Sequence, residues 1–277
     1  ETPGLIRAIG GLLILGGVMP ATAGTAEMFG VNAREARPFV GYLTQAFSLY
    51  QDLSVKENIE YIGELRLVPR KQIQERGLRY LKMFDMDRFT TRLAGRLSGG
   101  MKQKLALTCA LIAEPKILLL DEPTTGVDPV SRREFWDALA QLSAEGMTII
   151  VATPYLDEAE RCHRVGLMFD GDIHQIGTPK ELKEGLGLQR LEVRAADLRH
   201  AEDVLEADEQ IHDVQRFGDR LDVMVKELTA GEQTARAALQ KAQIPVLEIR
   251  TGLPTLENTF VSVLRNFHPE KPISPFP

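Results

Sequence analysis

One short stretch constrains the fold of this chain more than any other: four consecutive aliphatic residues, ILLL at 117–120, end directly in Asp121 and Glu122. An aliphatic run of this length, bounded by polar residues, is typical of a strand buried on both faces of a parallel sheet. Open α/β sheets bind their ligands at the carboxyl ends of the strands. The sequence therefore predicts an α/β fold with two carboxylates at the ligand-binding edge of its sheet.

The surrounding periodicity predicts that strands alternate with helices, which implies a parallel sheet. The expected elements are strand Phe39–Leu43, helix Gly99–Ile112, strand Lys116–Leu120, helix Val130–Leu142 and strand Met147–Ala152. Two further helices, Val55–Leu65 and Lys71–Phe84, separate the first strand from Ser98. We assign them, with the helix that follows Ser98, to a helical subdomain at about residues 54–112.

The last third of the chain predicts a different arrangement, a βαββαβ order that is typical of a small α+β, ferredoxin-like module. Its expected elements are strand Leu191–Val193, helix Ala201–Glu206, strand Ile211–Arg216, strand Leu221–Val225, helix Thr234–Lys241 and strand Val246–Ile249. A closing helix, Leu256–Phe267, precedes a proline-rich tail. We therefore expect an α/β domain at 1–187, the ferredoxin-like module with its closing helix at 188–267, and a linker or tail at 268–277.

Composition narrows the classes of partner. The 277 residues carry a formal net charge of -6, with a pI near 5.5, which argues against a general nucleic-acid-binding surface. The two cysteines have no metal-ligand spacing and are expected to be reduced packing residues. The apolar run at 5–19 is short and broken by glycines, so no transmembrane helix is expected and any membrane role requires a separate subunit.

Asp121 and Glu122 suit the hydrolysis of a magnesium-bound nucleotide. In such chemistry one carboxylate holds the magnesium shell and a neighbouring carboxylate polarises the attacking water. We assign Asp121 to the metal and Glu122 to catalysis. The alternative is that the pair only begins a solvated loop, an interpretation that the neighbouring motifs make less favourable.

A second candidate site begins at Ser98. Ser98, Gly99 and Gly100 open a helix, so free backbone N–H groups and a hydroxyl can meet phosphate oxygens without obstruction by side chains. The alternative is a plain N-cap, for which serine is a preferred residue. In the same way, Asp128 and Pro129 can simply start the helix from Val130.

These motifs resemble those of ABC ATPases: LSGGM at 97–101 their signature, ILLLDE at 117–122 their Walker B strand, and GVDP at 126–129 their D-loop. The resemblance implies a P-loop NTPase-like fold, with ATP and Mg²⁺ as cofactors. It also implies a head-to-tail dimer with a second ABC ATPase domain, whose nucleotide the signature of this chain contacts. The nucleotide-binding residues that it implies are Leu97, Ser98, Gly99, Gly100, Met101, Gln103, Gln45 and Asp128.

Other segments resemble parts of the same family. Gln45 resembles the Q-loop glutamine, whose amide reaches magnesium, and residues 46–59 resemble the surface that grips a membrane subunit. Asp128 is expected to cross the dimer interface. LSGGMKQK at 97–104 and PTLENTFVSVL at 254–264 resemble exporters of the ABC-2 type.

Two departures from the family pattern limit these expectations. The sequence contains no GxxxxGK[ST], the Walker A loop that binds phosphate in this family. Leu5–Leu13 resembles the helix that follows such a loop. Because the sequence starts at Glu1 and not at a methionine, we expect the loop to precede Glu1. Pro154 stands at the position of the switch histidine and offers no imidazole, so the site on the Walker B strand of this chain should hydrolyse slowly or not at all. Thr153 and Pro154 instead fit the N-cap and N1 positions of a helix.

The sequence thus predicts the ATP-binding subunit or half of an ABC exporter, peripheral on the cytoplasmic face of a membrane and coupled to transmembrane permease subunits, with no nucleic-acid partner. One alternative is a non-hydrolysing module that donates its signature to the ATP site of a partner. Another is a DNA-repair or translation ATPase, but the stretch between Gln45 and Ser98 has none of the sustained heptads of their coiled-coil insertions.

Overall fold

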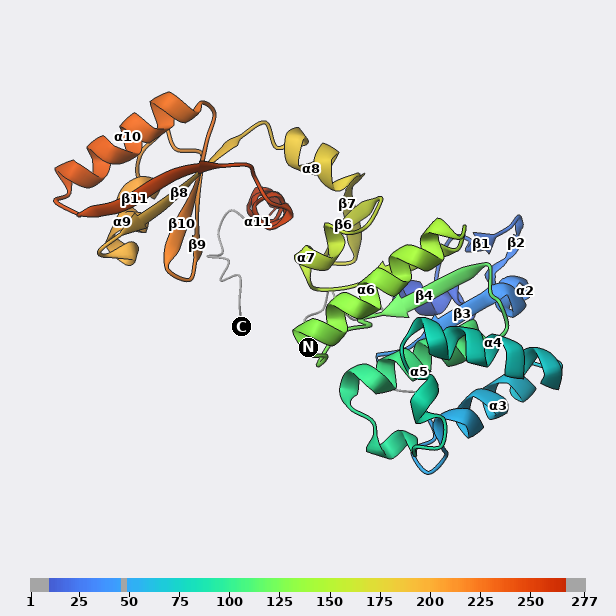
Figure 1. Cartoon of the computed structure of the whole chain (residues 1–277). Helices are drawn as coiled ribbons and strands as arrows, with labels where there is room; N and C mark the ends of the chain where they lie inside the picture. The colour runs from blue at the N-terminus through green and yellow to red at the C-terminus, as the bar shows by residue number, and fades with distance from the viewer. Residues whose placement is uncertain (1–9, 46–48, 268–277) are drawn as a thin grey trace. The chain divides into compact units, whose positions relative to one another are not determined.

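The computed structural model describes residues 10–45 and 49–267, and the chain divides into two compact units, Glu1–Pro154 and Tyr155–Pro277 (Figure 1). The tail predicted at 268–277 and the residues before 10 in the helix predicted at Leu5–Leu13 lie outside the described residues. The domain division predicted from the sequence, 1–187 and 188–267, remains a proposal.

The first unit is built on a parallel sheet of the order β3-β4-β5. Its strands are β3 (Val40–Leu43), β4 (Ile117–Asp121) and β5 (Thr148–Ala152). All five residues of the central strand, β4, are buried, as expected for a strand with a neighbour on each side and helices on both faces. The parallel sheet predicted from the aliphatic run is confirmed.

Alternation along β4 divides the core between the two faces of the sheet. Ile117 and Leu119 pack with Leu12 and Ala36, which come from the helical residues 10–15 and from α2 (Ala33–Ala36). β1 (Glu27–Met28), β2 (Val31–Asn32) and the 3-10 turn η1 (Arg37–Phe39) contact α2, and Met28 of β1 joins this part of the core. On the other side α5 (Gly99–Leu111) lies against β3, and α6 (Pro129–Ala144) packs on α5 and β5.

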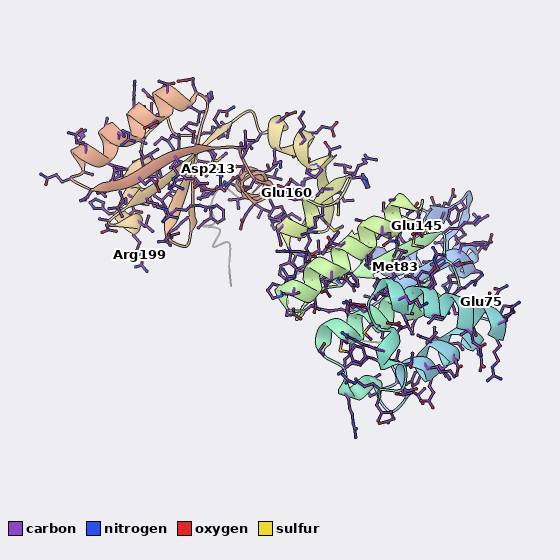
Figure 2. The ribbon with its side chains drawn as sticks, in the orientation of Figure 1. Glu75, Met83, Glu145, Glu160, Arg199 and Asp213 are labelled. Carbon is purple, nitrogen blue, oxygen red and sulfur yellow. The ribbon has the colours of Figure 1, made fainter. Side chains whose placement is uncertain are left out.

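Two more helices, α3 (Val55–Leu65) and α4 (Arg70–Met83), pack with α5, as expected for a helical subdomain. A capping box begins α3: the Glu57 N–H donates to Ser54 Oγ, and the Ser54 N–H donates to Glu57 Oε2. The 3-10 turns η2 (Asp87–Phe89) and η3 (Ala94–Arg96) lead to Ser98. An ion pair of 2.7 Å between Arg79 and Glu145, the latter labelled in Figure 2, joins α4 to the end of α6.

The second unit starts with a short helix that the sequence pattern placed wrongly. α7 spans Leu156–Ala159, and its N-cap is Tyr155, so the prediction that Thr153 and Pro154 occupy the N-cap and N1 positions is wrong. The physical reason is that Tyr155 keeps an extended backbone (φ -93°, ψ 111°), and its carbonyl is the first to accept helical N–H groups, from Glu158 and Ala159. An antiparallel hairpin, β6 (Val165–Phe169) and β7 (Asp172–Gly177), and α8 (Pro179–Gly185) follow.

The remainder of the second unit confirms the ferredoxin-like prediction. Four antiparallel strands lie in the order β11-β8-β10-β9, and two helices cover one face with an apolar core. The elements are β8 (Gln189–Ala195), α9 (Leu198–Glu206), β9 (Asp213–Phe217), β10 (Arg220–Val225), α10 (Leu228–Lys241) and β11 (Val246–Gly252).

The closing helix α11 (Leu256–Phe267) is attached to this module by a buried polar network. Asn258 Nδ2 donates to Gln215 Oε1 (2.9 Å) and to Asp222 Oδ2 (3.0 Å), and Arg190 donates to the same Asp222 oxygen (3.0 Å). Asp222 and Asn258 are almost fully buried, so each depends on its partners inside the unit for hydrogen bonds. The network therefore fixes α11 against β9 and β10 in a specific geometry.

We predict that Asn258→Ala destabilises the second unit by about 2 to 4 kcal/mol, because it removes the donor to the buried Gln215 Oε1, one of the donors to Asp222, and the acceptor of the Thr255 N–H. Urea unfolding of the full chain, followed by circular dichroism, measures the change. Gln233→Ala, at an exposed position on α10, is the matched control and should shift the transition by much less. Equal shifts for the two variants would contradict the structural role of the network.

Candidate functional site

The carboxyl edge of the parallel sheet brings together three of the residues selected from the sequence. Asp121 ends β4, Glu122 follows it, and Gln45 comes two residues after β3. Gln45 Nε2 donates a 3.0 Å hydrogen bond to Glu122 Oε2, although 77 positions separate the two residues. Thr125 Oγ1 donates to the same oxygen, also at 3.0 Å. Glu122 is thus held from two sides.

The backbone at Glu122 explains how two adjacent carboxylates reach one site. Glu122 adopts a left-handed conformation (φ 44°), and its N–H donates to the Ala152 carbonyl at the end of β5. A left-handed non-glycine residue is uncommon and disrupts the alternation of the strand. The turn therefore lets the side chain of Glu122 lie on the Gln45 side instead of continuing the strand pattern.

Each of these carboxylates has one oxygen without a hydrogen-bond partner among the residues that the structure describes. Asp121 is 3% exposed and Glu122 is 6% exposed, yet Asp121 Oδ1 and Glu122 Oε1 are buried without a hydrogen bond. Burial, and next the charge of Glu122, raise the pKa of Asp121. Burial and the nearby Asp121 charge also raise the pKa of Tyr42. A bound cation would compensate this concentration of negative charge, so the donor set fits an oxygen-preferring ion such as Mg²⁺.

The signature residues lie at the start of α5. Ser98 is the N-cap and its Oγ accepts from the Met101 N–H at 3.3 Å, so the capping interpretation is confirmed. Ser98 and Gly99 are exposed, and exposed N–H groups in a first helical turn can bind an anion. Leu97 and Gly100 are buried, and Gln103 is only 4% exposed. A contact between nucleotide and the side chain of Gln103 remains a prediction.

Asp128 has the structural role that the sequence offered as an alternative. Its Oδ1 accepts from the Val130 N–H (3.2 Å) and the Ser131 N–H (3.0 Å), which makes it the N-cap of α6. The backbone bond from Ser131 is the main cause that lowers the pKa of Asp128. Asp128 is exposed, so it remains accessible for the predicted contact across a dimer interface.

The structure thus forms two groups from the predicted site residues. Gln45, Asp121 and Glu122 meet at the sheet edge, whereas Ser98 and its neighbours lie beside the D-loop, where a methyl group on Gly99 would be 3.5 Å from the Gly126 carbonyl oxygen. The loop 122–128 connects the groups. The sequence did not lead us to predict the hydrogen bond from Thr125 to Glu122. The clue in the sequence was a hydroxyl three residues after Glu122.

Pro154 is exposed and follows β5 by two residues. Its ring presents no hydrogen-bond donor at this end of the sheet.

Within residues 10–45 and 49–267, no group of three or more His, Cys, Asp or Glu side chains is arranged to hold a metal ion. Over the same residues, no helix combines the length and the hydropathy needed to cross a membrane.

Solved structures with the same fold are ATP-binding cassettes. The protein cbiO1 from Clostridium perfringens, part of the ABC transporter complex cbiONQ, matches with a TM-score of 0.58 and 26% identity, over 66% of this chain and 76% of that chain. The cassette MJ0796, solved as a dimer with ADP and Pi, matches with a TM-score of 0.56 and 25% identity, over 62% and 80%. The parallel sheet and its edge therefore define an ATP-binding cassette.

Sequence comparison agrees with the fold. Residues 12–125 match the ABC transporter family, and residues 177–264 match the C-terminal domain of DrrA1-3-like ATP-binding proteins. The daunorubicin resistance ATP-binding protein DrrA2 of Streptomyces coeruleorubidus is 30% identical over 90% of this chain and 80% of its own length. The chain belongs to the ATP-binding proteins of ABC transporters, as the motifs predicted.

Another relative is similar over a shorter region. The probable multidrug ABC transporter ATP-binding protein YbhF of Escherichia coli (strain K12) is 45% identical over 175 residues, which are 62% of this chain. The matched region is only 30% of that protein, so the chain spans less than a third of its length.

We predict that Asp121→Asn stabilises the metal-free chain at pH 7 by about 1 kcal/mol, the scale of one poorly compensated buried polar group. Because the folded state raises the pKa of Asp121, the destabilised form is the ionised one. The gain should therefore be full above the folded-state pKa and vanish as the pH falls below the ordinary pKa of aspartate. Urea unfolding with a chelator at pH 7 and at pH 3, below the ordinary aspartate pKa of 3.8, measures it. Asp52→Asn, on the exposed surface, is the control, and a gain of equal size at both pH values would contradict the prediction.

Proposed function

We propose that this chain is the ATP-binding subunit, or half, of an ABC exporter, and that it couples ATP binding and hydrolysis to transport through separate membrane subunits. The observation that carries the proposal is the pair of buried, unpartnered oxygens of Asp121 and Glu122 beside Gln45. Such a site is costly in the absence of a ligand and becomes favourable when a cation bound to phosphate enters it.

Each residue of the sheet-edge group has a distinct role in this proposal. Asp121 holds the magnesium shell, and Glu122 accepts a proton from the attacking water. Gln45 keeps the Glu122 carboxylate in place through its amide N–H, which leaves its own amide oxygen for the metal shell. Mg²⁺, when bound, would neutralise charge on the phosphate oxygens.

The signature residues at the start of α5, Ser98 and its neighbours, serve a second ATPase domain in the proposed head-to-tail dimer. Ser98 and Gly99 are exposed at the start of α5, and the serine hydroxyl and the N–H groups there suit the phosphate of a nucleotide held by the partner. Asp128 would contact that partner across the interface. The dimeric state of the similar cassette MJ0796 supports this arrangement.

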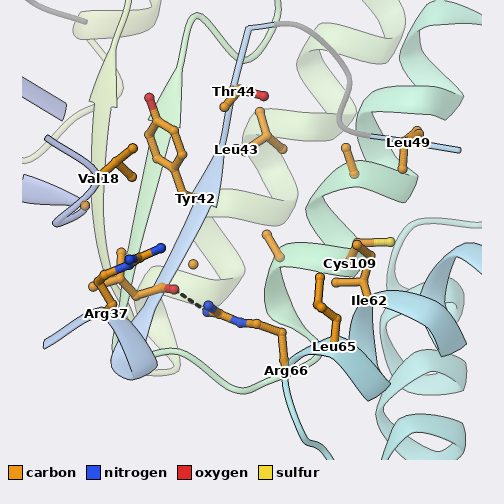
Figure 3. Close-up of a pocket in the computed structure, with 15 residues that line it drawn as sticks. Val18, Arg37, Tyr42, Leu43, Thr44, Leu49, Ile62, Leu65, Arg66 and Cys109 are labelled. Atoms are coloured by element: carbon orange, nitrogen blue, oxygen red, sulfur yellow. Dashed lines mark hydrogen bonds between the residues drawn. The ribbon is translucent and has the colours of Figure 1, made fainter. Parts of the chain in front are cut away.

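A docking site for a membrane subunit is proposed next to Gln45. A pocket of about 480 Å³ lies between β3, α3 and α5, with Thr44, Leu49, Ile62 and Arg66 among its lining residues (Figure 3). Leu65, also in its lining, is 66% exposed, so an apolar side chain of the pocket wall reaches the surface. A permease segment seated there would place the chain at the cytoplasmic face of the membrane as a peripheral subunit.

Pro154 favours a second candidate function, a non-hydrolysing module that completes the ATP site of a partner. The proline removes an imidazole from the switch position, whereas the signature is intact. In this alternative Ser98 remains essential and Glu122 does not. The two functions can therefore be separated by substitutions at these two residues.

We predict that Ser98→Arg abolishes ATP turnover by the assembled complex of ATPase and membrane subunits, because it puts bulk and a misplaced charge where a phosphate approaches the helix. ATPase activity of the purified complex measures the effect. Ser143→Arg, away from the signature on α6, is the control for an added arginine. Full activity of Ser98→Arg would remove the role given to the signature.

We also predict that Glu122→Gln lowers turnover of the complex by roughly 1,000-fold if each cycle requires hydrolysis at both sites, the scale of a lost catalytic base. The matched variant is the corresponding glutamate-to-glutamine change in the partner domain. Equal losses would support hydrolysis at the site of this chain. A loss confined to the partner variant would support the non-hydrolysing alternative.

A further inference from the structure

We propose that α5 and α6 form one rigid corner, in which Gly100 and Lys104 are positioning residues that set the location of Ser98. Neither residue needs to contact a nucleotide through its side chain. The inference rests on the proposed function for its catalytic consequence, but the corner itself is a property of this chain. It consists of a close helix contact at Gly100 and Ser131 and of an ion pair one turn further along.

The helix contact is too close for any side chain at Gly100. A methyl group on Gly100 would lie 2.5 Å from both Cβ and Oγ of Ser131, and 3.6 Å from Cγ1 of Val127. Cβ of Ser131 is fixed to the backbone of α6, so rotation of a side chain cannot relieve this overlap. A larger residue at 100 must therefore separate the two helices.

The two signature glycines, Gly99 and Gly100, therefore differ in their exposure and in the residues that they pack against. Gly99 is exposed, and among the described residues its added methyl group would meet the Gly126 carbonyl oxygen alone, at an ordinary 3.5 Å. Gly100 is buried, and its missing side chain points at α6. The lack of a side chain at Gly99 leaves room for a phosphate, whereas the lack of a side chain at Gly100 lets α5 pack closely on α6.

The ion pair extends the same contact. Lys104 follows Gly100 by four residues, and Glu134 follows Ser131 by three, so both pairs lie along one seam between the helices. Lys104 Nζ lies 2.6 Å from Glu134 Oε2, and the Lys104 side chain is only 12% exposed. A lysine this well buried depends on its carboxylate partner, because an unpaired charge would be strongly disfavoured.

The seam also reaches the D-loop. The Ser131 N–H that begins this part of α6 donates to Asp128 Oδ1 at 3.0 Å. Ser131 therefore touches Gly100 on one side and fixes Asp128 on the other. A displacement of α5 from α6 would move Ser98 relative to Asp128, although the proposed dimer needs both residues in one surface.

A rescue experiment in the assembled complex tests the proposal. We expect Gly100→Ala to lower ATP turnover by roughly 100-fold, the scale of a displacement of about 1 Å in a catalytic group. Adding Ser131→Gly removes the atoms that the methyl group meets and should restore most of the lost turnover. Ser131→Ala keeps Cβ and should not rescue. Turnover is measured at a temperature at which circular dichroism shows every variant to be folded, so loss of stability cannot account for the result.

Gly99→Ala provides the matched comparison, because any loss that it causes should not respond to Ser131→Gly. Failure of Ser131→Gly to rescue Gly100→Ala, with Ser131→Gly alone active, would overturn the proposal and indicate that residue 100 must be glycine for phosphate access.

The ion pair gives an independent test if Ser131→Gly is itself inactive. Lys104→Glu and Glu134→Lys should each lower turnover, and the double exchange should restore it; no restoration would overturn the proposal in that case.

If the unmodified complex has no ATP turnover, the proposed function fails separately. The corner is then judged by the melting temperature of the full chain, which Gly100→Ala should lower and Ser131→Gly should recover. Absence of that recovery would contradict the corner itself.

Discussion

The burial of two adjacent carboxylates, Asp121 and Glu122, is the constraint on which the rest of the first unit depends. β4 carries Asp121 and Glu122 into a site where each keeps one oxygen without a hydrogen-bond partner. Folding can tolerate this cost because helices and neighbouring strands bury all five residues of β4 and hold its end in place. The stable sheet therefore holds a site that suits a cation. The raised pKa of Asp121 reflects the negative charge buried there.

The loop from Glu122 to Asp128 connects the two halves of the proposed chemistry. At its start, Glu122 leaves β4 with a left-handed backbone and bonds to Gln45; at its end, Asp128 caps α6 and lies beside the signature helix through Ser131. This short loop thus links a group that serves the chain's own sheet edge with a group that suits a partner. Such a short connection makes independent movement of the two groups difficult, which would give a physical basis for coupling between the two ATP sites of the proposed dimer.

Local patterns predicted those elements that local interactions determine. The bounds of α3 and α11 agree with the sequence prediction, because a capping box starts α3 and strong amphipathic spacing defines α11. The order of the ferredoxin-like strands followed from alternation and turn residues. The sequence also selected Asp121, Glu122 and Gln45, but the bond between Gln45 and Glu122 joins residues 77 positions apart and could not be read from spacing.

Where sequence reasoning failed, a non-local or competing interaction decided the outcome. Thr153 and Pro154 satisfy the rules for a helix start, yet the extended Tyr155 supplies the first helical acceptor and moves α7 downstream. The β6–β7 hairpin was not predicted, because its strands are short and their exposed positions give a weak alternation. The packing of Gly100 on Ser131 depends on the distance between two helices, which no motif specifies.

The most direct measurement of the central claim is an experimental structure of the assembled transporter trapped with Mg-ATP. We expect magnesium in contact with Asp121, directly or through one water, and the hydroxyl of Ser98 at the γ-phosphate of the nucleotide held by the partner domain. Nucleotide and metal bound elsewhere, with Asp121 Oδ1 and Glu122 Oε1 still unpartnered and Ser98 away from phosphate in a closed dimer, would contradict it.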